Sequence, residues 1–570
     1  MYIDIVPNRN SRPAILLREN HREGEKIIKQ TLANLSSLPM DQVEAIRRIL
    51  KGEKLVNPTE IFEVVSSPHH GNVLAVLTAM RQLDFEKLIA SRPSRERDLV
   101  IAMVTARILK PDSKLATTRW WKDTTLPEIM RVSDATEVDL YNAMDWLLKR
   151  QDTIEKKLAG RHLTEGGMVL FDLTSSYFEG KCCPLAALGH DRDGKKGKLQ
   201  VNYGLLTDSR GVPVANLVFK GNMGDPKTLI PAVEKVRDKF GISEIVVIGD
   251  RGMISQKHIN GFKGKDWINW ITAMRSSAIQ KLVNNDALQM GLFDELNLFE
   301  FTHPDYPGER LIACRNPDLA RLRERKRKSL LDATIKELSK VKKMVESGRL
   351  KEKAEIGVRV GKVVNKFKVA KHFSLEISDN SFSWQIKEDK VMEEKALDGI
   401  YVIRTSLSPD RMDSDETVRN YKNLCHIEQA FRSFKTIDLE VRPIRHRLPT
   451  RVKAHILLCM LSYYVKWHMM EAVRPLIFAD EDLKAKQTRD PVAPAERSRK
   501  AIQKARTKKL SDGSMVHSFQ TLLNSLSTIA RNNYRYKYAE NTTPVFSMET
   551  TPSADQQKVF DLLRAIKCTQ

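Results

Sequence analysis

The chain has 570 residues, with 95 Lys and Arg against 72 Asp and Glu, and a formal net charge of +23. Hydrophobic residues make up 41% and charged residues 29%, which is globular usage, so a wholly disordered or fibrous chain is excluded. At about 100–200 residues per domain this length implies several domains, and the excess positive charge predicts a polyanionic partner, either nucleic acid or an acidic membrane surface.

The membrane alternative is disfavoured by the apolar segments. The first five residues lack the basic and apolar parts of a signal peptide. The longest uncharged apolar stretch, 454–465, has 12 residues, whereas about 20 are needed to cross a bilayer. The six cysteines form no CxxC pair, which argues against a zinc site or a disulfide framework and favours a reducing cytoplasm.

The N-terminal third is predicted to be a short leader followed by a helical domain. Residues 1–65 begin with strand-like stretches at Tyr2–Val6 and Ala14–Arg18, and a polar helix-like segment follows, ending near Leu38. From 66 to 164 apolar residues recur at a spacing of three to four, which predicts a bundle of helices.

Residues 165–274 change to the pattern of an α/β sheet. The expected elements are strands at 168–173, 200–207 and 212–220, a helix at 226–240, a strand at 245–250, a short helix and a strand at 267–274. Asp208-Ser209-Arg210-Gly211 predicts a hairpin turn between the second and third strands. An antiparallel hairpin beside crossover helices predicts a mixed sheet.

The alternation breaks at 275–397 and resumes at 398–470. The break contains a basic helical stretch, 321–371, with 18 basic and 6 acidic residues, and two short strands at 373–377 and 382–386. A strand at 399–404, a helix at 413–435 and a buried helix at 452–470 follow. The remainder, 471–570, is predicted to be a basic helical region, and its segment 484–509 holds 10 basic and 2 acidic residues.

Three carboxylates stand where such a sheet collects ligands. Asp172 and Asp250 each end an apolar strand, although Asp also ends strands simply as a turn residue. Side by side they would repel each other unless a divalent cation neutralised them. On the helix at 413–435, a seven-residue spacing places Tyr421, Glu428 and Lys435 along one face. The competing interpretation is an exposed helix with a Glu428–Arg432 pair.

Together these residues resemble the three motifs of the DDE insertion-sequence transposases, in the branch with a Tyr-x2-Arg-x3-Glu-x6-Lys signature. The matching segments are Phe171-Asp172-Leu173-Thr174, Ile248-Gly249-Asp250-Arg251-Gly252 and Tyr421…Glu428-Gln429-Ala430-Phe431-Arg432…Lys435, with further similarity at 221–228 and 451–455. The signature arginine is replaced by Leu424, and Arg432 is the candidate substitute.

The resemblance implies a ribonuclease-H-like α/β fold, interrupted by a β-rich and basic-helical insertion and preceded by an α-helical DNA-binding region. It implies that Asp172, Asp250 and Glu428 hold two Mg²⁺ ions, with Mn²⁺ as a substitute, for in-line attack on a phosphodiester. Tyr421, Arg432 and Lys435 would bind DNA.

On this resemblance we expect a bacterial, nucleoid-associated enzyme that binds terminal inverted repeats, cleaves DNA and joins the 3′-ends to target DNA. It would act as a homodimer on double-stranded DNA, and 321–371 and 484–509 would contact phosphates. The rival functions are a nuclease of the same fold without strand transfer and a catalytically dead DNA-binding relic.

Other candidate residues are assigned to structure rather than chemistry. The segment 189–196 nearly matches a phosphate-binding GxxxxGK[ST] loop, but Lys196 replaces the hydroxyl residue, so we predict a basic loop near the active site. Its neighbourhood holds possible spare metal ligands that are expected to be solvated charges: Asp191, Asp193 and Glu179. Further residues are predicted to be a surface pair, His69-His70, and packing tryptophans, Trp120-Trp121 and Trp384.

Overall fold

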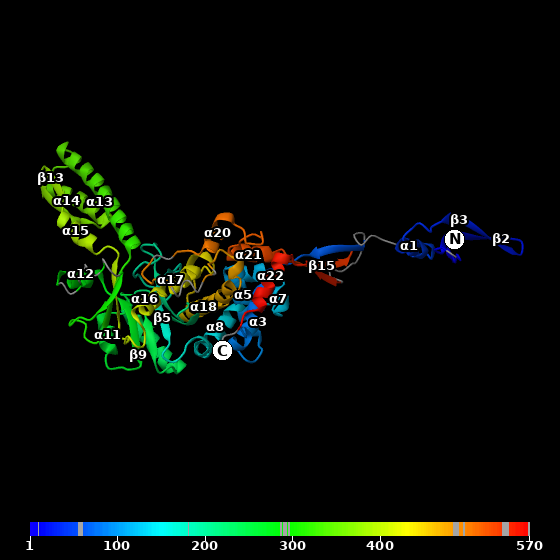
Figure 1. Cartoon of the computed structure of the whole chain (residues 1–570), viewed down its shortest axis with the longest axis horizontal. Helices are drawn as coiled ribbons and strands as arrows, with labels where there is room; N and C mark the ends of the chain where they lie inside the picture. The colour runs from blue at the N-terminus through cyan, green and yellow to red at the C-terminus, as the bar shows by residue number, and fades with distance from the viewer. Residues whose placement is uncertain are drawn as a thin grey trace. The chain divides into compact units, whose positions relative to one another are not determined.

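A computed structural model describes residues 1–9, 11–54, 61–180, 182–285, 288, 293, 297–480, 482, 489–493, 496–537 and 546–567 (Figure 1). The chain divides into two compact units. The first joins residues 1–68 to 530–550, and the second joins 69–529 to 551–570. The C-terminal part of the chain is therefore shared between the units.

The first unit contains two three-stranded antiparallel sheets, ordered β1-β2-β3 and β16-β15-β4, and the helix α1 (Met40–Leu50). Its strands are β1 (Tyr2–Val6), β2 (Ala14–Glu23), β3 (Lys26–Asn34), β4 (Phe62–Ser66), β15 (Arg531–Tyr536) and β16 (Phe546–Glu549). The range 471–570, predicted to be helical, thus also supplies two strands. β15 pairs with β4 across more than 460 positions of sequence, a pairing that local propensity does not reveal.

The polar helix predicted to end near Leu38 is wrong. β2 runs on to Glu23 and turns through Gly24, which has a φ of +63°, into β3. The hairpin is held by cross-strand pairing from Leu16 to Glu23 and by Arg18, whose Nε donates to Thr31 Oγ1 at 3.3 Å. A glycine that tolerates positive φ and this pairing outweigh the weak helical propensity of the segment.

The second unit begins with the predicted helical region. Ser94, Ser113 and Thr136 cap helix N-termini by accepting hydrogen bonds from backbone N–H groups, as short hydroxyl side chains do. The helices are α3 (Gly71–Gln82), α4 (Phe85–Ile89), α5 (Arg95–Leu109), α6 (Lys114–Trp120), η1 (Trp121–Asp123), α7 (Leu126–Ile129), α8 (Glu137–Leu148) and α9 (Gln151–His162). Helical structure is therefore confirmed for this region.

The described strands of the second unit include a mixed eight-stranded sheet ordered β10-β11-β14-β9-β8-β5-β6-β7. β5 is parallel to β8 and β8 to β9, while the other neighbours are antiparallel. The strands are β5 (Met168–Tyr177), β6 (Gln200–Thr207), β7 (Pro213–Lys220), β8 (Ile245–Ile248), β9 (Ile268–Ala273), β10 (Leu298–Phe301), β11 (Arg310–Arg315) and β14 (Ile400–Thr405). This sheet confirms the predicted mixed α/β class.

Helices connect and cover the strands of this sheet. Between β7 and β11 these are α10 (Pro226–Glu234), the π-helical turn η2 (Lys235–Lys239), α11 (Gln256–Phe262) and α12 (Ser276–Asn284). After β14 come α16 (Ser414–Lys422), α17 (Leu424–Arg432), the π-helical turn η5 (Ser433–Ile437) and α18 (Pro449–Ala472). The nearly all-buried α18 packs against α3, α5, α8 and β7, joining the helical region to the sheet.

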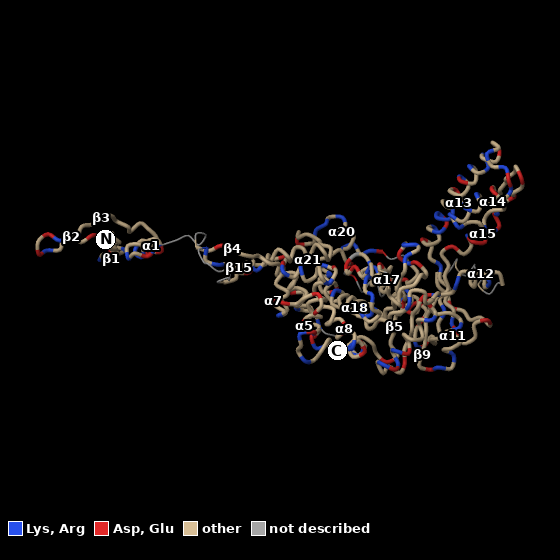
Figure 2. Tube along the Cα trace, turned by 180° about the vertical axis from the view of Figure 1, so that it is seen from behind, with Lys and Arg blue, Asp and Glu red and all other residues tan. Residues whose placement is uncertain are grey.

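Residues 275–397 divide between the sheet and an insertion. β10 and β11 extend the main sheet. The insertion comprises α13 (Pro317–Glu346), α14 (Lys353–Phe367), η4 (Ala370–His372), the hairpin β12 (Phe373–Ser378) and β13 (Ser381–Ile386), and α15 (Glu388–Ala396). Its own apolar core joins α13 and α14 to the hairpin. Figure 2 shows Lys and Arg along both long helices.

The end of the second unit is helical. It contains η6 (Arg474–Leu476), α20 (Arg499–Thr507), α21 (Phe519–Ser527) and α22 (Ala554–Arg564). Both α21 and α22 pack against α3. In the part of the chain that the structure describes, no helix combines the length and apolarity required to span a membrane.

Candidate active site

Asp172 and Asp250 lie at the same level of two neighbouring parallel strands. Leu170 of β5 is opposite Ile248 of β8, so two further residues along each chain bring the two aspartates level. β8 ends at Ile248, whereas β5 continues to Tyr177. Asp250 therefore occupies the turn at the carboxyl end of β8, beside the middle of β5, where open α/β sheets bind ligands.

The turn after β8 orients the Asp250 carboxylate. Its Oδ1 accepts hydrogen bonds from the backbone N–H groups of Gly252 at 3.0 Å and Met253 at 2.7 Å, and the side chain is exposed. A Cβ at position 252 would stand 3.4 Å from both carboxylate oxygens. The turn thus presents an exposed carboxylate in one orientation.

Glu428 comes from α17, which packs against β5. Phe431 is buried on the inner face of this helix, and its ring lies 6.1 Å from that of Tyr203 on β6 at a nearly perpendicular angle. Glu428 itself is exposed. The aromatic packing therefore fixes the helix so that the third carboxylate lies along the strand that carries Asp172.

The three carboxylates interact electrostatically around Asp172. Burial, together with the charges of Asp250 and Glu428, raises the pKa of Asp172 to about 7. A hydrogen bond from the Leu173 N–H to its Oδ1, at 2.8 Å, and the charge of Arg192 oppose this shift. The shift shows that both other carboxylates are close enough to make ionisation of Asp172 unfavourable.

A divalent cation fits this donor set. Among the residues that the structure describes, no group of three or more His, Cys, Asp and Glu side chains is arranged to hold a metal ion. Mg²⁺ does not need such a group, because it is bound through one or two carboxylates and takes its other ligands from water and phosphate. The mutual repulsion at Asp172 is the electrostatic cost that such a cation would remove.

Tyr421 and Arg432 flank these carboxylates on the same helical segment. Tyr421 is half-buried near the end of α16, and burial, together with the charges of Asp250 and Glu428, raises the pKa of its phenol to about 12. Its hydroxyl therefore stays protonated and can donate a hydrogen bond. Arg432 is exposed at the end of α17. Both side chains are available to a phosphate beside Glu428.

Lys435 lies in a different environment from Tyr421. On η5, its Nζ donates to Asp193 Oδ1 at 2.9 Å, and Arg442 Nη1 lies 2.6 Å from the same oxygen. The Asp193 side chain is only 3% exposed, and its Oδ2 accepts the Tyr177 N–H at 3.0 Å. Burial lowers the pKa of Lys435, while Asp193 opposes the shift. Lys435 is therefore already paired within the protein.

Comparison with known families accounts for this arrangement of carboxylates. The family described as "Transposase DDE domain" matches residues 169–465, which include Asp172, Asp250 and Glu428. The chain belongs to the DDE transposases. Residues 3–60 match the "IS1634 family transposase, N-terminal domain", which confirms the predicted relation to insertion-sequence transposases.

Solved transposase structures show only distant similarity to this transposase. A piggyBac transposase synaptic complex with hairpin DNA has 9% identity and a TM-score of 0.32, covering 80% of this chain and 79% of that chain. A Mos1 transposase paired-end complex with a left transposon end has 10% identity and a TM-score of 0.15, covering 36% of this chain and 66% of that chain. The search of curated proteins finds no match.

Asp193 and Arg442 are the residues that motif reasoning missed in this transposase. Asp193 was expected to be a solvated charge and is instead buried and paired, which corrects that prediction. Lys435 is 242 positions away in the sequence, so no local pattern could reveal their ion pair. Glu179, by contrast, forms an exposed pair with Arg445 at 3.2 Å.

The remaining candidates contribute to packing. The tryptophans behave as predicted: Trp121 is buried in the main core, and Trp384 packs against the ring of Phe373 with centroids 6.0 Å apart. The surface assignment of His70 is wrong, since it is 1% exposed and its Nδ1 lies 2.8 Å from Thr125 Oγ1. His69 is exposed, as predicted.

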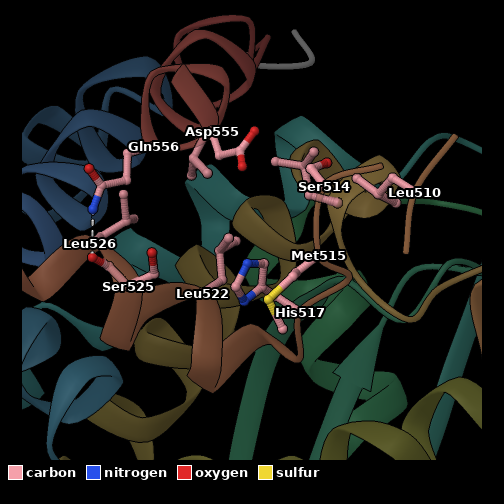
Figure 3. A pocket seen from close by; sticks show the side chains of 11 residues that line it. Leu510, Ser514, Met515, His517, Leu522, Ser525, Leu526, Asp555 and Gln556 are labelled. Atoms are coloured by element: carbon pink, nitrogen blue, oxygen red, sulfur yellow. Dashed lines mark hydrogen bonds between the residues drawn. The ribbon is translucent and has the colours of Figure 1, made fainter. Parts of the chain in front are cut away.

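A small cavity elsewhere in the second unit does not compete with this site. It lies among α21, α22 and the segment 510–517, where Gln556 Nε2 donates to the Ser525 carbonyl oxygen at 2.8 Å (Figure 3). Its volume of about 20 Å³ is enough for roughly one water molecule. It is therefore a packing defect at a helix junction and too small for a nucleotide.

Proposed function

We propose that this DDE transposase binds the terminal inverted repeats of an insertion sequence, cleaves DNA at the element ends and joins the 3′-ends to target DNA. The single observation that carries the proposal is the carboxylate cluster, in which burial and the charges of Asp250 and Glu428 raise the pKa of Asp172. Such a cluster is unfavourable in a protein without a cation and is suited to a phosphodiester bound through metal ions.

Asp172, Asp250 and Glu428 would hold the divalent ions. When bound, two Mg²⁺ ions, or Mn²⁺ in their place, activate the attacking oxygen and stabilise the leaving oxygen. The backbone N–H groups of Gly252 and Met253 keep the Asp250 carboxylate oriented.

Groups beside the carboxylates would hold the DNA. The protonated phenol of Tyr421 and the exposed guanidinium of Arg432 would contact phosphates next to the scissile bond. Lys435, assigned to DNA by the signature, sits one helical turn further on and is paired with Asp193.

Sequence-specific binding belongs to the helical region 66–164 in this proposal, and the basic surfaces add affinity. The basic stretch 321–371 spans most of α13 and all of α14, and many of its Lys and Arg side chains are exposed. Such side chains contact phosphates without reading sequence. Because two element ends must be processed together, we expect a homodimer on the DNA.

One assay separates this function from its rivals. Purified protein is incubated with Mg²⁺, duplexes that carry the element's terminal repeats, and a plasmid target. Joined products support transposition; cleavage without joining would identify a nuclease of the same fold, and binding without cleavage would identify a relic.

The carboxylates are tested in the same assay. Asp172→Asn, Asp250→Asn and Glu428→Gln should each abolish cleavage and joining while leaving DNA binding intact. Asp266→Asn is the matched control, because Asp266 is an exposed carboxylate that precedes β9, at the edge of the sheet opposite Asp250. Cleavage at the wild-type rate by Asp250→Asn would refute the assignment.

A further inference from the structure

The segment between β5 and β6, residues 178–199, borders the carboxylate cluster. β5 and β8 are parallel, so this segment and the turn that holds Asp250 emerge at the same edge of the sheet. Arg192 is near enough to lower the pKa of Asp172, and its Nη2 lies 2.5 Å from Asp225 Oδ1. Arg192 therefore brings the middle of this segment close to the carboxylates that would bind the scissile phosphate.

The middle of this segment is packed too tightly to be a free loop. A Cβ on Gly189 would stand 2.0 Å from the carbonyl oxygen of Gly221, and one on Gly221 would stand 1.8 Å from that of Gln200. Gln200 Nε2 donates to the carbonyl oxygens of Gly221 at 2.9 Å and His190 at 3.0 Å. The absence of a Cβ on Gly189 and Gly221 allows their backbones to approach closely, and the side-chain amide of Gln200 links the two segments by hydrogen bonds.

Asp193 fixes the segment to both halves of the catalytic core. Its carboxylate binds Lys435 and Arg442 from the second half and the Tyr177 N–H from the end of β5. Lys435 is 11% exposed and Arg442 21%. Charge-assisted hydrogen bonds shielded from water are strong and geometrically specific, so this contact determines where the segment stands.

The tip beyond Asp193 presents cations to solvent. Lys195, Lys196 and Lys198 are all exposed. Gly194 and Gly197 have φ values of +70° and +77°, a conformation that other residues adopt at a cost, and they turn the chain back toward β6. A rigid base thus carries a cationic tip on the same segment whose Arg192 acts on the acidic cluster, which is the charge pattern expected around a bound phosphodiester.

We propose that residues 192–198 form a binding element for the DNA backbone beside the catalytic carboxylates, and that Lys435 and Arg442 are positioning residues that act on it through Asp193. The proposal rests on the proposed function for the identity of the polyanion. It gives the signature lysine an indirect role, in which Lys435 places other cations against the phosphates.

The tip is tested against a matched pair of lysines. Binding to a fluorescent 40-base-pair duplex of arbitrary sequence is measured with Ca²⁺ in place of Mg²⁺ over a range of salt concentrations, because phosphate contacts do not depend on sequence. Lys196→Gln with Lys198→Gln should lower the slope of log affinity against log salt by about 2, one per lost contact.

Lys263→Gln with Lys265→Gln is the control. These residues form an identical Lys-Gly-Lys sequence whose glycine has a φ of +79°, but they precede β9 at the opposite edge of the sheet. Their replacement should leave the slope unchanged. Equal slopes for the two double variants would overturn the proposal.

Asp193→Asn distinguishes positioning from direct contact by the sign of its effect. If Lys435 touched DNA itself, removal of a neighbouring negative charge would free it and strengthen binding. If Asp193 positions the tip, the same change weakens binding several-fold, and adding Lys196→Gln and Lys198→Gln then costs little more. Tighter binding by Asp193→Asn would refute the positioning role.

Lys435 provides the second readout. Lys435→Arg keeps the charge that Asp193 needs and should retain the wild-type salt slope, whereas Lys435→Met should lower it. A lowered slope in both variants would contradict the proposal. These measurements need no cleavage, so a wild-type slope for the tip variant refutes the binding element alone. The proposed function is refuted separately, by wild-type cleavage in the Asp250→Asn variant.

Discussion

Replacing Asp172 with Asn should stabilise the metal-free protein above neutral pH. Burial and the neighbouring carboxylates raise the pKa of Asp172 from 3.8 to about 7. Because the folded state prefers the protonated carboxyl, Asp172 costs nothing below about pH 4, and its cost grows until the pH passes the folded pKa near 7. About three pKa units at 1.36 kcal/mol each make the full cost about 4 kcal/mol.

Thermal unfolding in EDTA at pH 5 and pH 8.5 measures this effect. Asp172→Asn should unfold at a higher temperature than the wild type at pH 8.5, and the difference should shrink at pH 5. Mg²⁺ should raise the unfolding temperature of the wild type at pH 8.5 more than that of the variant, because the cation neutralises the cluster. The exposed Asp266→Asn control should unfold at the same temperature as the wild type at both pH values and should respond to Mg²⁺ as the wild type does.

The reasoning fails if Asp172→Asn lowers the unfolding temperature at both pH values by the same amount. That result would mean that the carboxylate is satisfied in the folded state without a cation. It would also remove the electrostatic argument for a metal site at this edge of the sheet.

Three further predictions concern the same helical segment and its support. Lys466→Met should destabilise the protein by about 3–5 kcal/mol in urea unfolding, because the carboxylate of Asp438 loses the buried lysine that it pairs with. Adding Asp438→Asn should restore part of the lost stability. Tyr421→Phe should slow cleavage about 10–100-fold without changing the fold, as expected for a lost hydrogen bond to a charged phosphate; an unchanged single-turnover rate would rule out that contact. Leu424→Arg restores the signature arginine one turn before Glu428 and should steepen the salt dependence of DNA binding by about 1, most clearly when combined with Arg432→Gln; no change in that background would show that the position does not face DNA.

Local sequence patterns were sufficient to locate the edge of the sheet that carries the candidate carboxylates. The strand predicted at 200–207 has the bounds of β6, and the predicted turn forms because Asp208 Oδ1 accepts the N–H groups of Arg210 and Val212 at 2.9 Å each. Asp172 and Asp250 could be placed because each closely follows a short apolar run. The register that brings them level depends on parallel pairing, which the order of strand, helix and strand already indicates.

The features that sequence reasoning missed all depend on contacts between distant segments. No feature of the sequence around Asp193 indicates that Lys435 and Arg442 will pair with its side chain and cover it. β10 and β11 were assigned to a break in the α/β pattern, yet they extend the sheet because β11 pairs with β14 from Arg310 to Arg315. The composition of these two strands is ordinary, and only the strand that each pairs with identifies it.

The seven-residue spacing of the signature illustrates this limit within a single helix. On a regular α-helix, Tyr421, Glu428 and Lys435 would share one face. The structure changes to a π-helical turn at Ser433–Ile437, and a turn of this kind inserts about one extra residue, which rotates later side chains by roughly 100°. Tyr421 thus lies beside Glu428 and the other carboxylates, whereas Lys435 faces Asp193. In the function and the binding element that we propose, the seven-residue spacing therefore joins two sites: one for the scissile phosphate and one that positions the segment beside it.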